Sequence, residues 1–154
     1  MNTVLVTGGS KGIGSAIAEE FASLGYAVAI NYNKSEEKAK ALSLELMKKY
    51  KVPVGAYKAD VKNRNEVAEM VTKIKDELGT IVILVNNAGI STQKEFSQIT
   101  NEEWKIMLST HIDGAFNCTQ EVLHDMIYRQ YGKIINISSM WGVTGGSCEV
   151  HYST

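Results

Sequence analysis

A glycine-rich segment near the start of the chain, residues 7–14, has residue types and a spacing that suit phosphate binding. It follows an apolar run at residues 4–6 and precedes an amphipathic stretch, which predicts a strand that turns into a helix. In such a turn Gly8 allows the tight bend, Gly12 lets the backbone approach phosphates, and Gly14 lets the helix pack closely on its strand. Because the first turn of a helix also offers free N–H donors, the segment predicts a site for a dinucleotide pyrophosphate.

Two further polar groups follow apolar runs farther along the chain. Asn86-Asn87-Ala88-Gly89 comes directly after one run, at the carboxyl edge where ligands bind in an open α/β sheet. Its amides could tie neighbouring strand ends together, and the small Ala88 and Gly89 leave room for a cofactor. Ser139 closes a later run, and Tyr152 follows it by thirteen positions. A hydroxyl and a phenol can both donate to one substrate oxygen.

The apolar pattern predicts the scaffold that must position these residues. Short runs rich in branched residues, as expected of strands buried on both faces, lie at residues 4–6, 27–30, 54–57, 81–85 and 134–137. Segments of helical period alternate with them. The order predicts an α/β fold with a doubly wound parallel sheet and helices on both faces, which makes three layers.

Four helices are predicted between the strands. Gly25 ends the first, the second runs from about Ser35 to Tyr50, and Gly79 ends the third. Thr100 and Glu103 predict a capping box at the start of a long fourth helix. Its apolar residues are expected to share one face that covers the sheet, with surface to spare for a partner subunit: Trp104, Met107, Leu108, Ile112, Ala115, Phe116, Val122, Leu123, Met126 and Ile127.

Composition narrows the classes of partner. The chain has 154 residues, 44% of them hydrophobic and 21% charged, which fits one globular domain. A net charge of -1 offers no basic face for nucleic acid or a membrane, so small molecules are the expected partners. Without a signal peptide or an apolar stretch that could span a bilayer, we expect a cytoplasmic protein. Cys118 and Cys148 lack metal-ligand and redox-motif spacing and are interpreted as reduced thiols, and no metal is expected.

Taken together, the motifs resemble the short-chain dehydrogenase/reductase family, and within it the 3-oxoacyl-[acyl-carrier-protein] reductases. The family pattern T-G-x-x-x-G-x-G matches residues 7–14, N-N-A-G matches residues 86–89, and the serine-to-tyrosine spacing matches Ser139 and Tyr152. The resemblance covers the whole chain and implies that residues 1–154 are an NADP-binding Rossmann domain. It also implies a homo-oligomer and a carbonyl substrate that is either a small molecule or bound to a carrier protein.

The resemblance also implies which residues hold the cofactor. Those around its phosphates would be Gly8, Ser10, Lys11, Gly12, Ile13 and Gly14. Asp60 and Val61 would hold the adenine, with the Asp60 carboxylate accepting from the exocyclic amine. Asn87, Ala88 and Gly89 would lie against the cofactor. Without the resemblance, Asp60 could equally be a turn residue at the end of a strand.

Charge favours NADPH as the cofactor. An acidic residue after the second strand would bond a ribose 2′-OH and repel a 2′-phosphate, but this chain has Tyr32-Asn33-Lys34-Ser35 there. Lys34 beside Asn33, together with Lys11, would attract the 2′-phosphate. The alternative is that both lysines are solvated surface residues.

For the reaction, the resemblance implies hydride transfer from the nicotinamide to a carbonyl carbon. Tyr152 would be the general acid that protonates the carbonyl oxygen, and Ser139 the donor that orients it. An unaided tyrosine, with a pKa near ~10, is poorly matched to neutral pH. The family corrects this with a lysine four positions after the tyrosine, which would be the second residue beyond Thr154.

His111 departs from the family pattern. The family usually has an asparagine at this position of the fourth helix, where it supports a water relay to the lysine. A histidine could carry protons, so we expect a catalytic role for His111. The alternative is a structural histidine, because His111 lies on the apolar stripe of the predicted helix.

The expected activity is NADPH-dependent reduction of a 3-oxoacyl group on acyl-carrier protein, as in fatty acid synthesis. Trp141-Gly142 and residues 146–150 are also similar to a subgroup that reduces a ketone attached to a lysine of translation elongation factor P. Because the chain ends inside the tyrosine motif, we expect it to be a portion of a longer reductase, without the C-terminal part of the fold. A hypothesis of another class is a non-catalytic fragment that binds NADP or dimerises.

Overall fold

The computed structural model describes residues 2–154 and contains one five-stranded parallel sheet. The strands lie in the order β3-β2-β1-β4-β5, and each neighbouring pair is parallel. Their bounds are Thr3–Val6 (β1), Ala27–Tyr32 (β2), Val54–Lys58 (β3), Ile81–Asn86 (β4) and Lys133–Asn136 (β5). All five predicted strands are therefore confirmed, but Ile137 was wrongly included in the last. Ile137 follows β5, and its N–H still donates to the Asn86 carbonyl oxygen at 2.9 Å.

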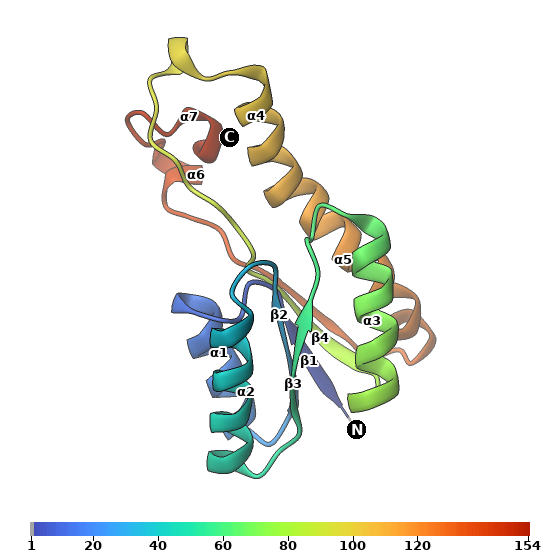
Figure 1. Ribbon diagram of the computed structural model, residues 1–154. Coiled ribbons are helices and arrows are strands. Elements are labelled where there is room, and N and C mark those ends of the chain that lie inside the picture. The colour runs from blue at the N-terminus through green and yellow to red at the C-terminus, as the bar shows by residue number, and fades with distance from the viewer. Residues whose placement is uncertain (1) are drawn as a thin grey trace.

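Helices cover both faces of the sheet (Figure 1). Helices α1 (Gly12–Ser23) and α2 (Glu36–Tyr50) pack on one face, and α3 (Arg64–Leu78) and α5 (Gly114–Tyr128) on the other. In β1, Val4 and Val6 join the core beneath α1 and α2, whereas Leu5 joins the core beneath α3 and α5. This alternation follows from the pleat of a strand. The predicted three-layer, doubly wound fold is confirmed.

The strands at the centre of the sheet are buried, whereas the edge strand β5 is exposed. Every residue of β1 and β2 is buried, as the continuous apolar runs predict. Strand β5 forms one edge and is exposed along its length, with Ile134 and Ile135 at 37% and 40% of their full exposure. The described chain thus leaves an apolar strand open to solvent at the end of the sheet.

The long fourth helix was predicted as one regular helix, and this is wrong at its centre. Helix α4 (Asn101–Leu108) passes into a π-helical segment, Ser109–Asp113, before α5 begins. A π-turn adds a residue to the repeat, so the side chains before and after it do not stay on one face. Met107, Val122 and Met126 are buried as expected, but Ile112 and Phe116 are more than half exposed. The predicted capping box is confirmed, since Glu103 N–H donates to Thr100 Oγ1 at 3.2 Å and Thr100 N–H to Glu103 Oε2 at 2.8 Å.

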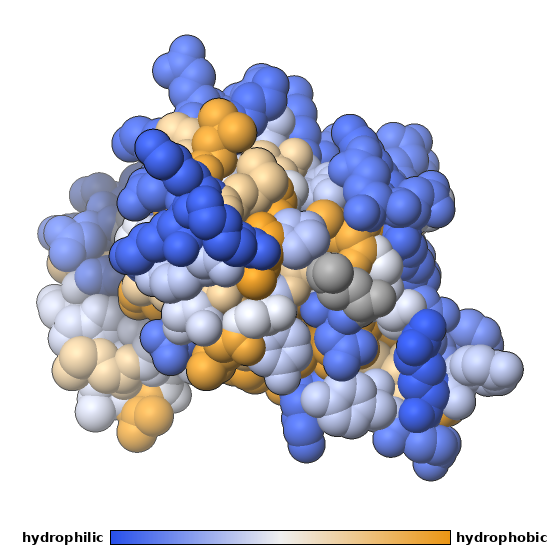
Figure 2. Space-filling model, turned by 90° about the horizontal axis from the view of Figure 1, so that it is seen from below, coloured by the Kyte–Doolittle hydropathy of each residue, from blue (hydrophilic) through white to orange (hydrophobic). Residues whose placement is uncertain are grey.

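Beyond the carboxyl ends of the strands, three short elements lie around α4 (Figure 1). They are the 3₁₀ turn Phe96–Gln98 and the helices α6 (Trp141–Thr144) and α7 (Val150–Ser153), none of which the apolar pattern predicted as separate elements. Helix α7 carries Tyr152. Within residues 2–154 no helix is long and apolar enough to cross a membrane. The opposite end of the molecule, seen from below in Figure 2, shows mainly hydrophilic side chains with separate apolar patches.

Candidate active site

Thr7 ties the glycine-rich loop to the end of β4. Its Oγ1 accepts hydrogen bonds from the backbone N–H groups of Asn87 and Ala88, both at 2.9 Å. In return, the Asn87 side-chain amide donates to the carbonyl oxygens of Thr7 at 2.8 Å and Gly8 at 3.3 Å. Asn86 makes the matching link on the other side, donating to Asn136 Oδ1 on β5 at 2.9 Å. The two asparagines therefore join three neighbouring strand ends, as the sequence suggested.

Asn31 fixes the loop from the other side, and sequence reasoning missed it. Its side chain is 2% exposed at the end of β2. Oδ1 accepts from Gly8 N–H at 3.2 Å, and Nδ2 donates to the Ala59 carbonyl oxygen at 3.0 Å. A polar side chain inside the apolar run of β2 must find partners when it is buried, and this was the signal that could have revealed it.

The close packing of the loop explains two of its glycines. Gly8 has φ +60°, and a Cβ there would lie 2.9 Å from the Ala88 Cα. A Cβ on Gly14 would lie 2.5 Å from both Asn87 Nδ2 and the Gly8 carbonyl oxygen. Gly14 thus lets α1 approach the loop that follows β1 and the end of β4.

The start of α1 is open for a ligand. Gly12 has positive φ and faces open space, and the N-cap residue Lys11 makes no side-chain cap to the helix. The first turn of a helix has N–H groups without partners inside the helix, so this end of α1 presents donors of the kind a phosphate accepts. These features fit the pyrophosphate of a dinucleotide.

A cleft of about 620 Å³ lies at the carboxyl edge of the sheet. It is lined from the glycine-rich loop, the ends of β3, β4 and β5, the π-helical segment and α7. Eight of the predicted site residues line it: Ile13, Val61, Asn87, Ala88, Gly89, His111, Ser139 and Tyr152. The fold therefore brings together residues that are up to 139 positions apart in the sequence.

The other predicted site residues lie outside the lining of this cleft. Gly8 and Ser10 belong to the loop that follows β1, Gly12 and Gly14 to the first turn of α1, and Lys11 is its exposed N-cap residue. Asn33 and Lys34 are exposed just after β2. The nearest carboxylate that follows, Glu36, forms an ion pair with Lys40 at 2.6 Å.

Asp60 and Val61 follow β3 and have different surroundings. The Asp60 carboxylate accepts from Lys62 N–H at 3.1 Å and lies 3.4 Å from the Lys62 ammonium nitrogen, which is the geometry of a turn residue. Val61 is buried, and its side chain fills the space where Gly114 has no Cβ. The Asn117 side-chain amide donates to the Val61 carbonyl oxygen at 3.0 Å, another contact that the sequence did not indicate.

Ser139 keeps its hydroxyl proton available. Its Oγ accepts from the backbone N–H of Trp141 at 3.2 Å. Because a hydroxyl has one hydrogen and two lone pairs, this contact occupies a lone pair and leaves the hydrogen free to donate into the cleft.

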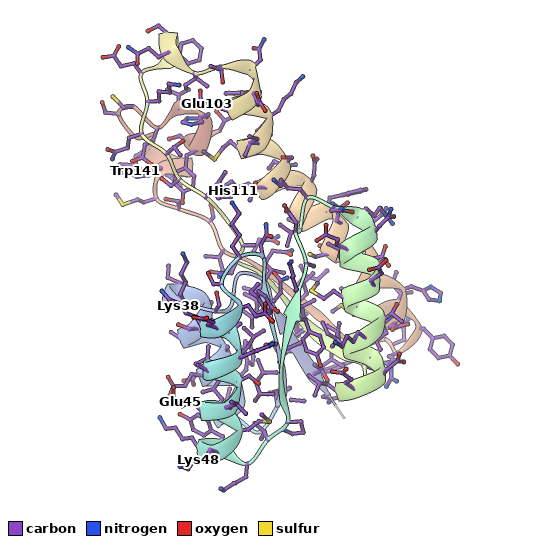
Figure 3. All side chains as sticks on the ribbon, in the orientation of Figure 1. Lys38, Glu45, Lys48, Glu103, His111 and Trp141 are labelled. Atoms are coloured by element: carbon purple, nitrogen blue, oxygen red, sulfur yellow. The ribbon has the colours of Figure 1, made fainter. Side chains whose placement is uncertain are left out.

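His111 lies in the π-helical segment and points toward the segment that follows β4 (Figure 3). Its Nε2 is 2.8 Å from the Ile90 carbonyl oxygen and 3.2 Å from the Ile90 N–H, so it donates to the first or accepts from the second according to its tautomer. The imidazole also meets the Tyr152 ring edge to face, with centroids 5.4 Å apart. A Cβ on Gly89 would lie 2.6 Å from His111 Cε1. The expectation that His111 lies on an apolar stripe is therefore wrong, because the π-turn directs it to the cleft.

Within residues 2–154, no group of three or more His, Cys, Asp or Glu residues is placed to hold a metal ion. The donors around the cleft are hydroxyl, amide, imidazole and phenol groups. They suit proton transfer and hydrogen bonding to a polar substrate.

Comparison with known proteins identifies the family. The family described as short chain dehydrogenase matches residues 2–154. The chain belongs to this family. In an open α/β sheet of this strand order, the switch point between β1 and β4 is the expected place for a dinucleotide, and the cleft lies there.

Curated relatives of this short-chain dehydrogenase include reductases. It is 38% identical over 150 residues to the 3-oxoacyl-[acyl-carrier-protein] reductases of Staphylococcus epidermidis and Staphylococcus aureus. It is 41% identical over 149 residues to the acetoacetyl-CoA reductase of Paracoccus denitrificans. Each match covers 97% of this chain, but only 61% of the staphylococcal proteins and 59% of the Paracoccus protein.

Proposed function

We propose that residues 1–154 form the NADP-binding part of a carbonyl reductase. The observation that carries this proposal is the shared cleft, in which Ser139 and Tyr152 face the same space as Ile13 and the Asn-Asn-Ala-Gly segment, residues 86–89. A cofactor bound along the glycine-rich loop would then reach the two hydroxyl-bearing residues. Bound NADPH would supply the hydride that goes to the carbonyl carbon.

The residues of the chain would then handle the carbonyl oxygen. Ser139 donates its free hydroxyl hydrogen to this oxygen, which holds the substrate and stabilises the negative charge that develops there. Tyr152 transfers its phenol proton to the oxygen as the C–H bond forms, so the product is an alcohol and the phenolate is reprotonated from solvent. His111, in edge contact with Tyr152, is proposed to support the transfer of that proton.

The cofactor is proposed to be NADPH rather than NADH. Exposed Lys34 follows β2, Lys11 lies at the start of α1, and the neighbouring Glu36 is paired with Lys40. The cationic side chains of Lys11 and Lys34 would therefore meet a 2′-phosphate, while the next carboxylate in the sequence, Glu36, is paired with Lys40.

Charge reversal tests this choice. Lys34→Glu should raise the Kd for NADPH by about tenfold, the factor that corresponds to 1.36 kcal/mol, and leave the Kd for NADH unchanged. Lys48→Glu is the matched control, because Lys48 lies near the C-terminal end of α2, the helix that begins two residues after Lys34 (Figure 3). Equal effects of the two substitutions on NADPH, measured by fluorescence titration, would contradict a 2′-phosphate site at Lys34.

The substrate is proposed to be a 3-oxoacyl thioester, carried on acyl-carrier protein. The names of the staphylococcal and Paracoccus relatives support this class, since both describe reduction of an oxoacyl group. The alternative substrate is a ketone on a lysine of elongation factor P. Assays of the full-length protein with acetoacetyl thioesters and NADPH distinguish them, because absence of thioester turnover beside turnover of the protein-bound ketone would remove the fatty-acid function. NADPH binding without turnover of either would support the non-catalytic alternative.

The full-length protein is also proposed to be a homo-oligomer. Helix α5 and the π-helical segment leave Ile112, Phe116 and Ile127 between 53% and 60% exposed. Burial of such side chains against a second copy is favourable by about 25 cal/mol per Å². Light scattering should give a mass at least twice that of one chain, and Phe116→Glu should lower it.

A further inference from the structure

Residues 91–94 begin one residue after the segment 86–89 and are hydrogen-bonded to Cys148, Glu149 and His151, just before Tyr152. Ser91 Oγ donates to Glu149 Oε2 at 3.0 Å, and Gln93 Nε2 donates to Glu149 Oε1 at 3.2 Å. Thr92 Oγ1 lies 2.8 Å from His151 Nε2. The backbone is joined as well, since Lys94 N–H donates to the Cys148 carbonyl oxygen at 2.7 Å.

The two titratable side chains in these contacts, Glu149 and His151, are both buried. Glu149 is 8% and His151 2% exposed, although most of residues 91–98 are exposed. A buried carboxylate is costly unless its oxygens accept hydrogen bonds, and each oxygen of Glu149 has one donor. His151 has its Nδ1 buried without a partner among the described residues, so Thr92 fixes the imidazole through Nε2 alone. We refer to Ser91, Thr92, Gln93, Glu149 and His151 as the polar clasp.

The polar clasp is connected to Tyr152 through the backbone of α7. Glu149 is the N-cap residue of α7, and its carbonyl oxygen accepts from Tyr152 N–H at 3.1 Å and from Ser153 N–H at 2.8 Å. His151 is the residue before Tyr152. A shift of either clasp side chain therefore moves the turn that carries the phenol, while neither Glu149 nor His151 lines the cleft.

From this arrangement we propose that Glu149 and His151 are positioning residues that set Tyr152 at a fixed place relative to the cofactor-binding segment 86–89. The proposal rests on the proposed reductase function. The clasp acts through the loop 91–94, which is separated from Gly89 by Ile90 alone, so it couples the position of the proton donor to the position of the cofactor. Neither side chain needs to touch the substrate for this role.

The test compares Glu149→Leu with Glu149→Gln in the full-length protein. Glu149→Leu removes both acceptors and should lower kcat for NADPH-dependent reduction about tenfold, while the KM for NADPH stays within about twofold, because the loop around the phosphates is untouched. Hydrogen exchange should accelerate in residues 146–154. Glu149→Gln keeps one carbonyl acceptor and should restore most of kcat. Glu95→Leu, an exposed glutamate on the same loop, is the matched control and should leave kcat unchanged.

Two outcomes would overturn the proposal: faster exchange in residues 146–154 with unchanged kcat, or unchanged exchange together with unchanged kcat. If Glu149→Leu fails to fold, Thr92→Val removes the partner of His151 instead and should give a smaller fall in kcat of the same kind. A wild-type protein without any NADPH-dependent turnover would contradict the reductase function instead. In that case the exchange rate of residues 146–154 alone decides whether the clasp holds the Tyr152 segment.

Discussion

At the scale of single residues, Thr7 shows how one hydroxyl organises the proposed cofactor site. Thr7 follows β1, and its Oγ1 accepts from two consecutive backbone N–H groups at the end of β4. The same hydroxyl donates to the Val85 carbonyl oxygen, with the two oxygens 3.2 Å apart. No apolar side chain of the same shape could accept these bonds. The glycine-rich loop therefore depends on Thr7 for its place beside Asn87.

Thr7→Val should lower the free energy of unfolding by about 1–3 kcal/mol, because the N–H groups of Asn87 and Ala88 would lose their acceptor in a largely buried place. Cofactor binding should weaken in parallel. Thr7→Ser keeps the hydroxyl and is the control. Urea unfolding curves of the two variants measure the difference, and equal stabilities of Thr7→Val and Thr7→Ser would contradict this role of the hydroxyl.

The two cysteines should differ in reactivity. Burial, with a smaller effect of Glu121, raises the pKa of the Cys118 thiol to about 12, whereas Cys148 is exposed. Since the thiolate is the reactive form, a disulfide reagent should modify one thiol of residues 1–154 quickly and the second only on unfolding. Cys148→Ser should remove the fast reaction. Two fast thiols in the native protein would show that the helix carrying Cys118 opens readily.

At the scale of elements, the start of α4 combines a helix cap with an ion pair. The Lys94 ammonium lies 2.7 and 2.8 Å from the two carboxylate oxygens of Glu103. This contact and the hydrogen bonds from Thr100 lower the pKa of Glu103 from its ordinary 4.5 to about 2. The loop that carries the polar clasp is thus also fastened to α4.

Because the folded-state pKa of Glu103 is depressed, the folded protein binds this proton less readily than the unfolded chain. The resulting stabilisation is complete above pH 4.5 and is lost as pH falls from 4.5 toward 2. Wild type and Glu103→Gln should therefore differ in urea midpoint at pH 7 and converge at low pH. Glu102→Gln, its exposed neighbour, is the control. A difference between wild type and Glu103→Gln that does not change with pH would contradict the ion pair.

Elements also show what the sequence could and could not predict. The central strands β1, β2 and β4 were predictable because a strand buried on both faces must be apolar throughout, as Ala-Val-Ala-Ile is in β2. The capping box was predictable because its partners are three residues apart. The π-turn was not, since the apolar spacing of α4 and α5 also fits a regular helix. Contacts between distant segments, such as Asn31 with Gly8 or Glu149 with Ser91, need the fold before they can be seen.

At the scale of the whole molecule, the parallel sheet β3-β2-β1-β4-β5 places the glycine-rich loop and the catalytic candidates at its carboxyl edge. Motifs near residues 7, 86 and 139 meet there because each follows a strand, and parallel strands end on the same side. The membership of the family and the shared cleft together support hydride transfer to a carbonyl as the function of the full-length protein.

The most direct test of this function follows the hydride itself. NADPH labelled with deuterium at C4 is incubated with the full-length protein and acetoacetyl-CoA, and the product is analysed by mass spectrometry. We predict deuterium on the carbinol carbon of the 3-hydroxyacyl product, and loss of this product in Tyr152→Phe although NADPH still binds. A 3-hydroxyacyl product without the label, or an undiminished rate in Tyr152→Phe, would contradict the proposed function.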